Sequence, residues 1–195
     1  MKKKIILYLY GKFKAFGYYY RSQQLANIRR LPNVFMHDSL YLGDHTNISI
    51  PGNVKELTIA ENVSTRMFCN FLMHSNSTLI IHKGVFFNNY CSINCLGYIE
   101  IGENTMFGEG VKVYDHNHSY SYQKDQLIVE KGEFKIGAIK IGKNCWIGSN
   151  VTILNNVEIG DNVIIGANCL IYKSIPANSI VKLNAGYTIS DQKIT

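Results

Sequence analysis

A six-residue repeat in the second half of the chain constrains the fold more than any other feature. From Ile141 to Pro176 the sequence divides into six hexads without a gap, and each begins with an isoleucine. Two further hexads begin at Ile101 and Phe107, and weaker copies begin at Leu42, Ile59, Ile81 and Phe87. A fixed short period indicates stacked repeats, whereas a helix would show apolar residues at a spacing of about 3.6. We therefore expect an all-β fold in which a short strand and a turn recur every six residues.

Each position of the hexad has a physical role. The first residue is large and apolar and is expected to fill the core, and the fifth is small or β-branched and is expected to point inward. The fourth is often asparagine, which tolerates left-handed backbone and so suits a corner. Four of the five cysteines occupy the fifth position: Cys69, Cys91, Cys145 and Cys169. We expect these thiols to be small buried side chains rather than nucleophiles or metal ligands.

The charge of the chain is unevenly distributed. The net charge is +6, but residues 1–30 hold eight of the Lys and Arg residues and no acid, so the remainder carries −2. This distribution argues against a basic domain that binds nucleic acid. No apolar run approaches the ~18 residues needed to span a bilayer. The first ten residues resemble a signal peptide but lack a small-residue cleavage site, so we expect them to be retained and the protein to be cytoplasmic.

The N-terminal residues have the spacing of an amphipathic helix. Apolar residues recur at intervals of three and four: Ile6, Leu9, Phe13, Phe16 and Tyr20. Such a helix could cap the first coil of the repeat, or lie peripherally on an anionic membrane surface through residues 1–20, and one helix could do both. The predicted organisation is a helical arm over 1–40, a repeat domain over 41–176 with an insertion at 119–140, and a tail over 177–195.

A polar cluster at Tyr114–His118 interrupts the repeat where the insertion begins. His116 and His118 could be solvated loop residues, and Asp115 could simply begin a turn. The two histidines share a face of a strand and could bind zinc, but a third ligand is missing because the cysteines are expected to point inward. One of them could instead be a general base, since an imidazole can accept a hydroxyl proton near neutral pH.

The repeat resembles that of the hexapeptide-repeat acyltransferases over roughly residues 40–176. The resemblance implies a left-handed parallel β-helix, here of about six coils, with an N-terminal helix and a protruding loop after His118. Residues 115–118 are similar to the Asp-His-Asn-His segment of bacterial polysaccharide O-acetyltransferases. The resemblance therefore assigns the catalytic base to His118, with His116 as the second candidate and Asp115 as part of the acceptor site. Phe86–Tyr90 is similar to a segment whose asparagine contacts the acceptor, which corresponds to Asn89.

The resemblance also implies a site for acetyl-CoA as co-substrate. Asn144–Ser149 is similar to a family segment that places Trp146 beside the pantetheine and the acetyl group. Four more residues correspond to positions along coenzyme A: Ser149, Ala167, Tyr172 and Lys173. The segment Lys182–Tyr187 departs from the family pattern that holds the nucleotide. No metal is implied.

These observations predict an acetyl-CoA-dependent O-acetyltransferase. Its acceptor would be a sugar hydroxyl in a bacterial surface polysaccharide or its precursor. The histidine would act as a general base and no acyl-enzyme would form. The resemblance further implies a homotrimer with sites between neighbouring copies. N-acetylation of an amino sugar or acetylation of an antibiotic is the alternative among enzymes, and a non-catalytic β-helix scaffold is the alternative of another class.

Overall fold

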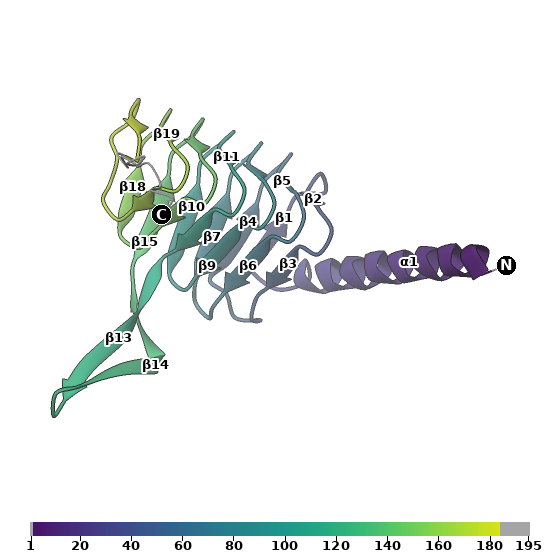
Figure 1. The fold of residues 1–195 in the computed structure, drawn as a ribbon, viewed down its shortest axis with the longest axis horizontal. Helices are drawn as coiled ribbons and strands as arrows, with labels where there is room; N and C mark the ends of the chain where they lie inside the picture. Colours follow the sequence, from purple (N-terminus) through teal and green to yellow (C-terminus); the bar gives the residue numbers. More distant parts are fainter. Residues whose placement is uncertain (1, 184–195) are drawn as a thin grey trace, which may run out of the picture.

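The computed structural model describes residues 2–183, in which a long helix precedes a solenoid of short strands (Figure 1). Residues 184–195 of the predicted tail lie outside the described residues, as do the side chains of Phe13, Phe16 and Tyr20. The helix, α1, spans Lys2–Ile28. A two-stranded hairpin, formed by β13 (His116–Gln123) and β14 (Gln126–Ile136), projects from the side of the solenoid (Figure 1).

Three parallel sheets form the solenoid, and each coil contributes one strand to each sheet. Sheet A consists of β1 (Val34–Met36), β4 (Glu56–Ile59), β7 (Thr78–Ile81), β10 (Tyr98–Ile101), β15 (Ala138–Ile141) and β18 (Val157–Ile159). Sheet B consists of β2 (Tyr41–Leu42), β5 (Ser64–Thr65), β8 (Phe86–Phe87), β11 (Met106–Phe107), β16 (Trp146–Ile147), β19 (Ile164–Ile165) and β21 (Ile180–Val181). Sheet C consists of β3 (Asn47–Ser49), β6 (Asn70–Met73), β9 (Ser92–Cys95), β12 (Lys112–Tyr114), β17 (Thr152–Ile153) and β20 (Leu170–Ile171). The predicted left-handed parallel β-helix of about six coils is confirmed.

The core is a column of side chains from the first and fifth hexad positions. The isoleucines that begin the six continuous hexads are all buried, and so are Ile101 and Phe107. The Phe87 and Phe107 rings stack on successive coils with their centroids 4.7 Å apart, and Phe71 meets Phe87 edge to face. The four cysteines predicted to point inward are buried, as is Cys95. Core packing therefore follows the sequence repeat directly.

Asparagines form most corners of the coils, as predicted. Seven fourth-position asparagines have positive φ angles between 56° and 62°: Asn62, Asn104, Asn144, Asn150, Asn156, Asn162 and Asn168. This left-handed conformation is sterically easier for asparagine than for most residues. At the corner between sheets A and B, the side chains of Asn104, Asn144, Asn162 and Asn178 form a hydrogen-bonded ladder along the solenoid.

Helix α1 contacts the solenoid only through its last turn. Ile28 is buried, Leu25 packs against the core, and Gln24 Nε2 donates to Ile48 O at 3.3 Å. The rest of the helix extends away from the first coil (Figure 1). The described apolar side chains near its start are all exposed: Ile5, Ile6, Tyr8, Leu9 and Tyr10. Among the described residues, no helix combines the length and apolarity required to cross a bilayer.

The insertion is a β-hairpin rather than an irregular loop. Its pairing begins at His116, which pairs with Ile136, and it closes at Lys124 and Asp125, which both have positive φ angles. Two consecutive left-handed residues make the tight turn that suits two antiparallel strands. Where the hairpin returns to the solenoid it passes Gly97, and a Cβ at that position would lie 2.5 Å from Ile136 Cγ2 and 2.9 Å from Gly137 O. Glycine at position 97 therefore allows the hairpin to leave and rejoin the coil at one place.

Candidate active site

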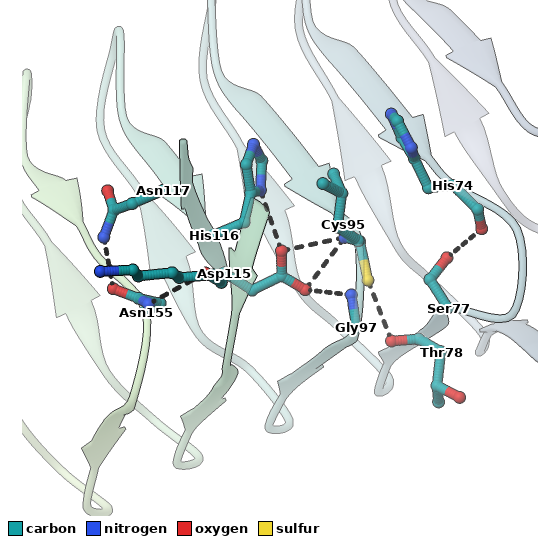
Figure 2. Close-up of polar contacts among 11 residues, drawn as sticks. His74, Ser77, Thr78, Cys95, Gly97, Asp115, His116, Asn117 and Asn155 are labelled. Atoms are coloured by element: carbon teal, nitrogen blue, oxygen red, sulfur yellow. Dashed lines mark hydrogen bonds and ion pairs between the residues drawn. The ribbon is translucent and has the colours of Figure 1, made fainter. Parts of the chain in front are cut away.

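The carboxylate of Asp115 is fully buried at the point where the hairpin leaves sheet C. Its Oδ1 and Oδ2 accept from Leu96 N at 2.9 and 3.0 Å, and Oδ2 also accepts from Gly97 N at 2.8 Å. Oδ1 lies 3.1 Å from His116 Nδ1 (Figure 2). A buried carboxylate requires such partners, because a charge without them would be strongly destabilising.

This arrangement fixes both the orientation and the tautomer of His116. The oxygens of Asp115 already accept backbone N–H groups, so the contact with Nδ1 is one in which the imidazole donates. The proton on Nδ1 leaves Nε2 with a lone pair for accepting a proton. His116 is only 15% exposed, which limits the positions that the ring can adopt. An oriented imidazole backed by a buried carboxylate is the arrangement of a general base.

His118 lies next along the hairpin in a different environment. It is exposed, and its Nδ1 lies 3.2 Å from Glu130 O, so a backbone carbonyl rather than a carboxylate orients it. Both histidines pack on Phe134 of β14. The ring centroids of His116 and Phe134 are 5.2 Å apart with an interplanar angle of 89°, and those of His118 and Phe134 are 4.7 Å apart. His74, from an earlier coil, meets the same phenylalanine at 6.1 Å.

The base of the hairpin is tied to the next coil. Asn117 Nδ2 donates to Asn155 Oδ1 at 2.9 Å, and Asn155 Nδ2 donates to Lys135 O at 3.4 Å (Figure 2). Gly137 N donates to Asp115 O at 2.7 Å. These bonds hold both strands of the hairpin close to the solenoid, so the position of His116 is set by its backbone as well as by Asp115.

Asn89 lies at a different corner from the histidines. It belongs to the turn between β8 and β9, at the corner between sheets B and C, and its Oδ1 accepts from Met67 N at 3.1 Å. The width of sheet C separates this corner from Asp115, and a four-residue strand such as β9 spans about 13 Å. A single copy of the chain therefore does not bring Asn89 beside His116.

Three residues expected to bind coenzyme A lie on the same side as Asn89. Ser149 and Ala167 occupy the position of Asn89 in later coils, because Gly110 N, Asn150 N and Asn168 N donate to Asn89 O, Glu109 O and Ser149 O. Trp146 is on the outer face of sheet B and is 55% exposed. In register with it stand other outward apolar side chains, namely Met106 and Ile164.

Tyr172 and Lys173 follow β20 at the edge of sheet C from which the hairpin emerges in an earlier coil. Both are exposed, and Lys173 Nζ lies 5.6 Å from the centroid of the Tyr172 ring. The structure therefore divides the predicted site residues between two edges of sheet C. One edge carries Asn89, Ser149 and Ala167, and the other carries Asp115, His116, Tyr172 and Lys173.

The cysteines lack the environment of a nucleophile. Burial raises the pKa of the Cys95 thiol, and the nearby Asp115 raises it further. Burial also raises the pKa of Cys145. A raised pKa keeps a thiol protonated and unreactive at neutral pH. Within residues 2–183, no group of three or more His, Cys, Asp and Glu side chains is arranged to hold a metal ion.

Sequence reasoning missed the aromatic contact that packs the two histidines. Phe134 follows His118 by more than ten residues and reaches it only because the hairpin pairs these two positions. The alternation of Phe134 and Ile136 is the signal that could have indicated a strand. It also missed Asn94, whose Oδ1 is buried and without a hydrogen-bond partner among the described residues. Asn94 pairs with Tyr114 immediately before the site.

Comparison with protein families supports the repeat. Residues 138–173 match the model described as bacterial transferase hexapeptide with six repeats. The hexapeptide repeat recognised in the sequence is thereby confirmed for this segment. A comparison with curated protein sequences finds no match.

Several solved structures are similar to the chain. A hexapeptide-repeat acetyltransferase from Vibrio cholerae is 18% identical, with 82% of this chain and 73% of that chain covered and a TM-score of 0.48. The polysialic acid O-acetyltransferase OatWY is 21% identical, with coverages of 83% and 90% and a TM-score of 0.48. AntD, an N-acyltransferase from Bacillus cereus in complex with dTDP and coenzyme A, is 19% identical, with coverages of 83% and 82% and a TM-score of 0.43. At these values the similarity assigns no activity or substrate to the present chain.

Proposed function

We propose that the protein is an acyltransferase that moves an acetyl group from acetyl-CoA to a sugar hydroxyl in a bacterial surface polysaccharide or its precursor. The observation that carries this proposal is the contact between buried Asp115 and His116 on a hexapeptide solenoid. The family whose model matches residues 138–173 is one of bacterial transferases, which supports group transfer as the reaction class.

His116 is the general base in this proposal. The resemblance assigned the role to His118, with His116 second, but the contacts of Asp115 support His116. Nε2 takes the proton of the acceptor hydroxyl as its oxygen attacks the carbonyl carbon of the thioester. The carbon–sulfur bond then breaks, and the thiolate of coenzyme A takes the same proton from Nε2. No acyl-enzyme is required, and the buried cysteines do not participate.

Completion of the site by a second copy of the chain follows from the separation of its parts. Asn89 and His116 lie at opposite edges of sheet C, so one copy would supply the base and its neighbour would supply Asn89 and Trp146. The exposed Nδ2 of Asn89 would then stabilise the oxyanion. The apolar row on sheet B, which includes Trp146 and Met106, supports contact between copies because large exposed apolar patches mark interaction sites. The homotrimer implied by the family resemblance satisfies this geometry.

Helix α1 supports a location at the inner face of a membrane. Its exposed apolar side chains near the start follow Lys2–Lys4 and precede Lys12 and Lys14. Apolar side chains can enter the lipid interface while lysines are attracted to anionic headgroups. A cytoplasmic enzyme held in this way would be close to lipid-linked glycans.

A thiol-release assay tests the function. Purified protein is mixed with acetyl-CoA and a panel of sugars that offers hydroxyl or amino acceptors, and free thiol is followed with time. The proposal predicts thiol release that depends on a hydroxyl acceptor and on His116. Release only with amino sugars would change the acceptor class. The absence of release with every acceptor, from protein of native circular dichroism, would favour a non-catalytic scaffold.

A further inference from the structure

Three aromatic residues occupy left-handed corner positions where other coils have asparagine or glycine. At the corner between sheets B and C, His45, Phe68 and Tyr90 have φ angles of 59°, 60° and 61°. The equivalent positions in the next three coils are Gly110, Asn150 and Asn168. Left-handed backbone is strongly disfavoured for bulky side chains, and such strain concentrates at functional sites. The aromatic residues therefore require a reason beyond the geometry of the corner.

The three rings form a stack along the solenoid. The centroids of His45 and Phe68 are 4.8 Å apart with an interplanar angle of 10°, and those of Phe68 and Tyr90 are 5.2 Å apart with an angle of 6°. Phe68 is covered on both faces by its neighbours. The stack ends at Tyr90 because the next position is Gly110, which has no side chain. Tyr90 is 55% exposed, against 44% for Phe68, so one face of the tyrosine is open.

Polar groups surround the open face of Tyr90. Asn89 precedes it in the same turn and uses Oδ1 to accept from Met67 N, which leaves Nδ2 as a donor. Glu109 precedes Gly110 in the next coil and is exposed, so its carboxylate is available as an acceptor. Gly110 N donates to Asn89 O at 2.9 Å, which places the two turns directly against each other. A flat aromatic face flanked by a donor and an acceptor is thus open to solvent.

We propose that the open face of Tyr90 is a subsite on which a pyranose ring of the acceptor stacks. The C–H groups on one side of a pyranose are weakly positive and pack against the negative face of an aromatic ring. Asn89 Nδ2 would donate to a ring hydroxyl and Glu109 would accept from another. The absent side chain at Gly110 provides the clearance for the sugar. This inference rests on the proposed function, because it takes a sugar as the ligand and the corner of Asn89 as part of the acceptor site.

Two asparagine substitutions separate binding from the support of the fold. Tyr90→Asn and Phe68→Asn replace aromatic residues at equivalent positions with the residue that most corners use, so both variants should retain the solenoid. Only Tyr90 presents a free face, which makes Phe68→Asn the matched control. A third variant, Gly110→Asn, keeps a residue that tolerates the φ of +71° but fills the clearance. A Cβ at this position would lie 2.5 Å from Asn150 Oδ1, the movable end of a side chain.

Saturation-transfer NMR with methyl glycosides of glucose, galactose and N-acetylglucosamine provides the test, with no acetyl-CoA present. The wild-type protein and Phe68→Asn should saturate the ring C–H protons of at least one glycoside. Tyr90→Asn and Gly110→Asn should lose that signal at least fivefold, with circular dichroism spectra like that of the wild type. Equal signals from Tyr90→Asn and Phe68→Asn, or no signal from the wild type with any glycoside, would overturn the proposal.

Two further outcomes distinguish this inference from its rivals. If Tyr90→Asn changes the sedimentation coefficient and leaves the sugar signal intact, the stack is a contact between copies of the chain and the proposal is wrong. If the glycoside signal depends on Tyr90 but thiol release never occurs, the subsite stands and the acyltransferase function fails. If thiol release occurs and the KM for the sugar is the same in Tyr90→Asn, the function stands and the subsite fails.

Discussion

Asp115 Oδ1 lies 3.1 Å from His116 Nδ1, and the Asp115 side chain has no exposed surface. Backbone N–H groups of Leu96 and Gly97 hold the carboxylate from the opposite side, so it cannot rotate to follow the imidazole. The histidine is therefore oriented by a group that is itself fixed. This arrangement distinguishes His116 from His118, whose Nδ1 meets only a backbone carbonyl of the hairpin.

We expect Asp115→Asn to lower kcat at least about 100-fold, because an amide group can favour the wrong tautomer of His116. The KM for acetyl-CoA should remain within about twofold, since Asp115 is a positioning residue that does not reach the donor. Steady-state kinetics with both substrates varied measure the two parameters separately. A rise in KM with unchanged kcat would contradict a positioning role, and thermal melting would reveal any general loss of the fold.

Trp146→Ala should raise the KM for acetyl-CoA about tenfold, which corresponds to about 1.4 kcal/mol of lost binding. The reason is that Trp146 is 55% exposed on sheet B and contributes a large apolar surface. Trp146→Phe is the matched control and should have a smaller effect. Light scattering at micromolar concentration should give the mass of a trimer for the wild type, and a monomeric wild type would remove the shared site.

Much of the fold could be predicted because its signal is local and repeated. Ile147 and Ile165 stand at equivalent positions of successive coils, so the same inference applies at each and errors do not accumulate. The hairpin could not be predicted in the same way, because its pairing of His118 with Phe134 occurs once and joins residues far apart in sequence. The insertion was therefore predicted as a loop although its residues form two strands.

The candidate site was predicted only in its composition. The sequence indicated Asp115, His116 and His118 together, but neighbouring residues on a strand point to opposite faces, so spacing alone does not show which histidine meets the carboxylate. The contact arises because the chain leaves the coil at Asp115. The separation of Asn89 from His116 is also invisible in the sequence, since it depends on which corner each turn occupies.

Stability at acid pH should depend on Glu100. Hydrogen bonds from Tyr98, then His82, lower the pKa of Glu100 below its ordinary value of 4.5, so the folded state binds its proton less readily than the unfolded state. This contribution to stability is present above the unfolded pKa and is lost as the pH falls through the folded pKa. Glu100→Gln should therefore show a smaller decrease in Tm than the wild type between about pH 5 and pH 3. Parallel curves of Tm against pH would contradict this expectation.

Residues 1–20 should bind anionic vesicles weakly, and more weakly as the salt concentration rises. Each basic side chain near an anionic surface contributes about 1 kcal/mol, and this attraction is screened by salt. Co-sedimentation of the full-length chain and of a version that lacks residues 1–20 measures the effect. Equal and salt-insensitive partitioning of the two proteins would contradict a membrane role for α1.

The most direct test of the account compares His116→Ala with His118→Ala in the thiol-release assay, at saturating acetyl-CoA and with the best sugar acceptor. We predict that His116→Ala lowers kcat at least about 100-fold and that His118→Ala lowers it less than about tenfold, because only His116 is backed by a buried carboxylate. Circular dichroism and thermal melting should show that both variants are folded. Loss of turnover in His118→Ala, together with near-normal turnover in His116→Ala, would contradict the assignment of the base.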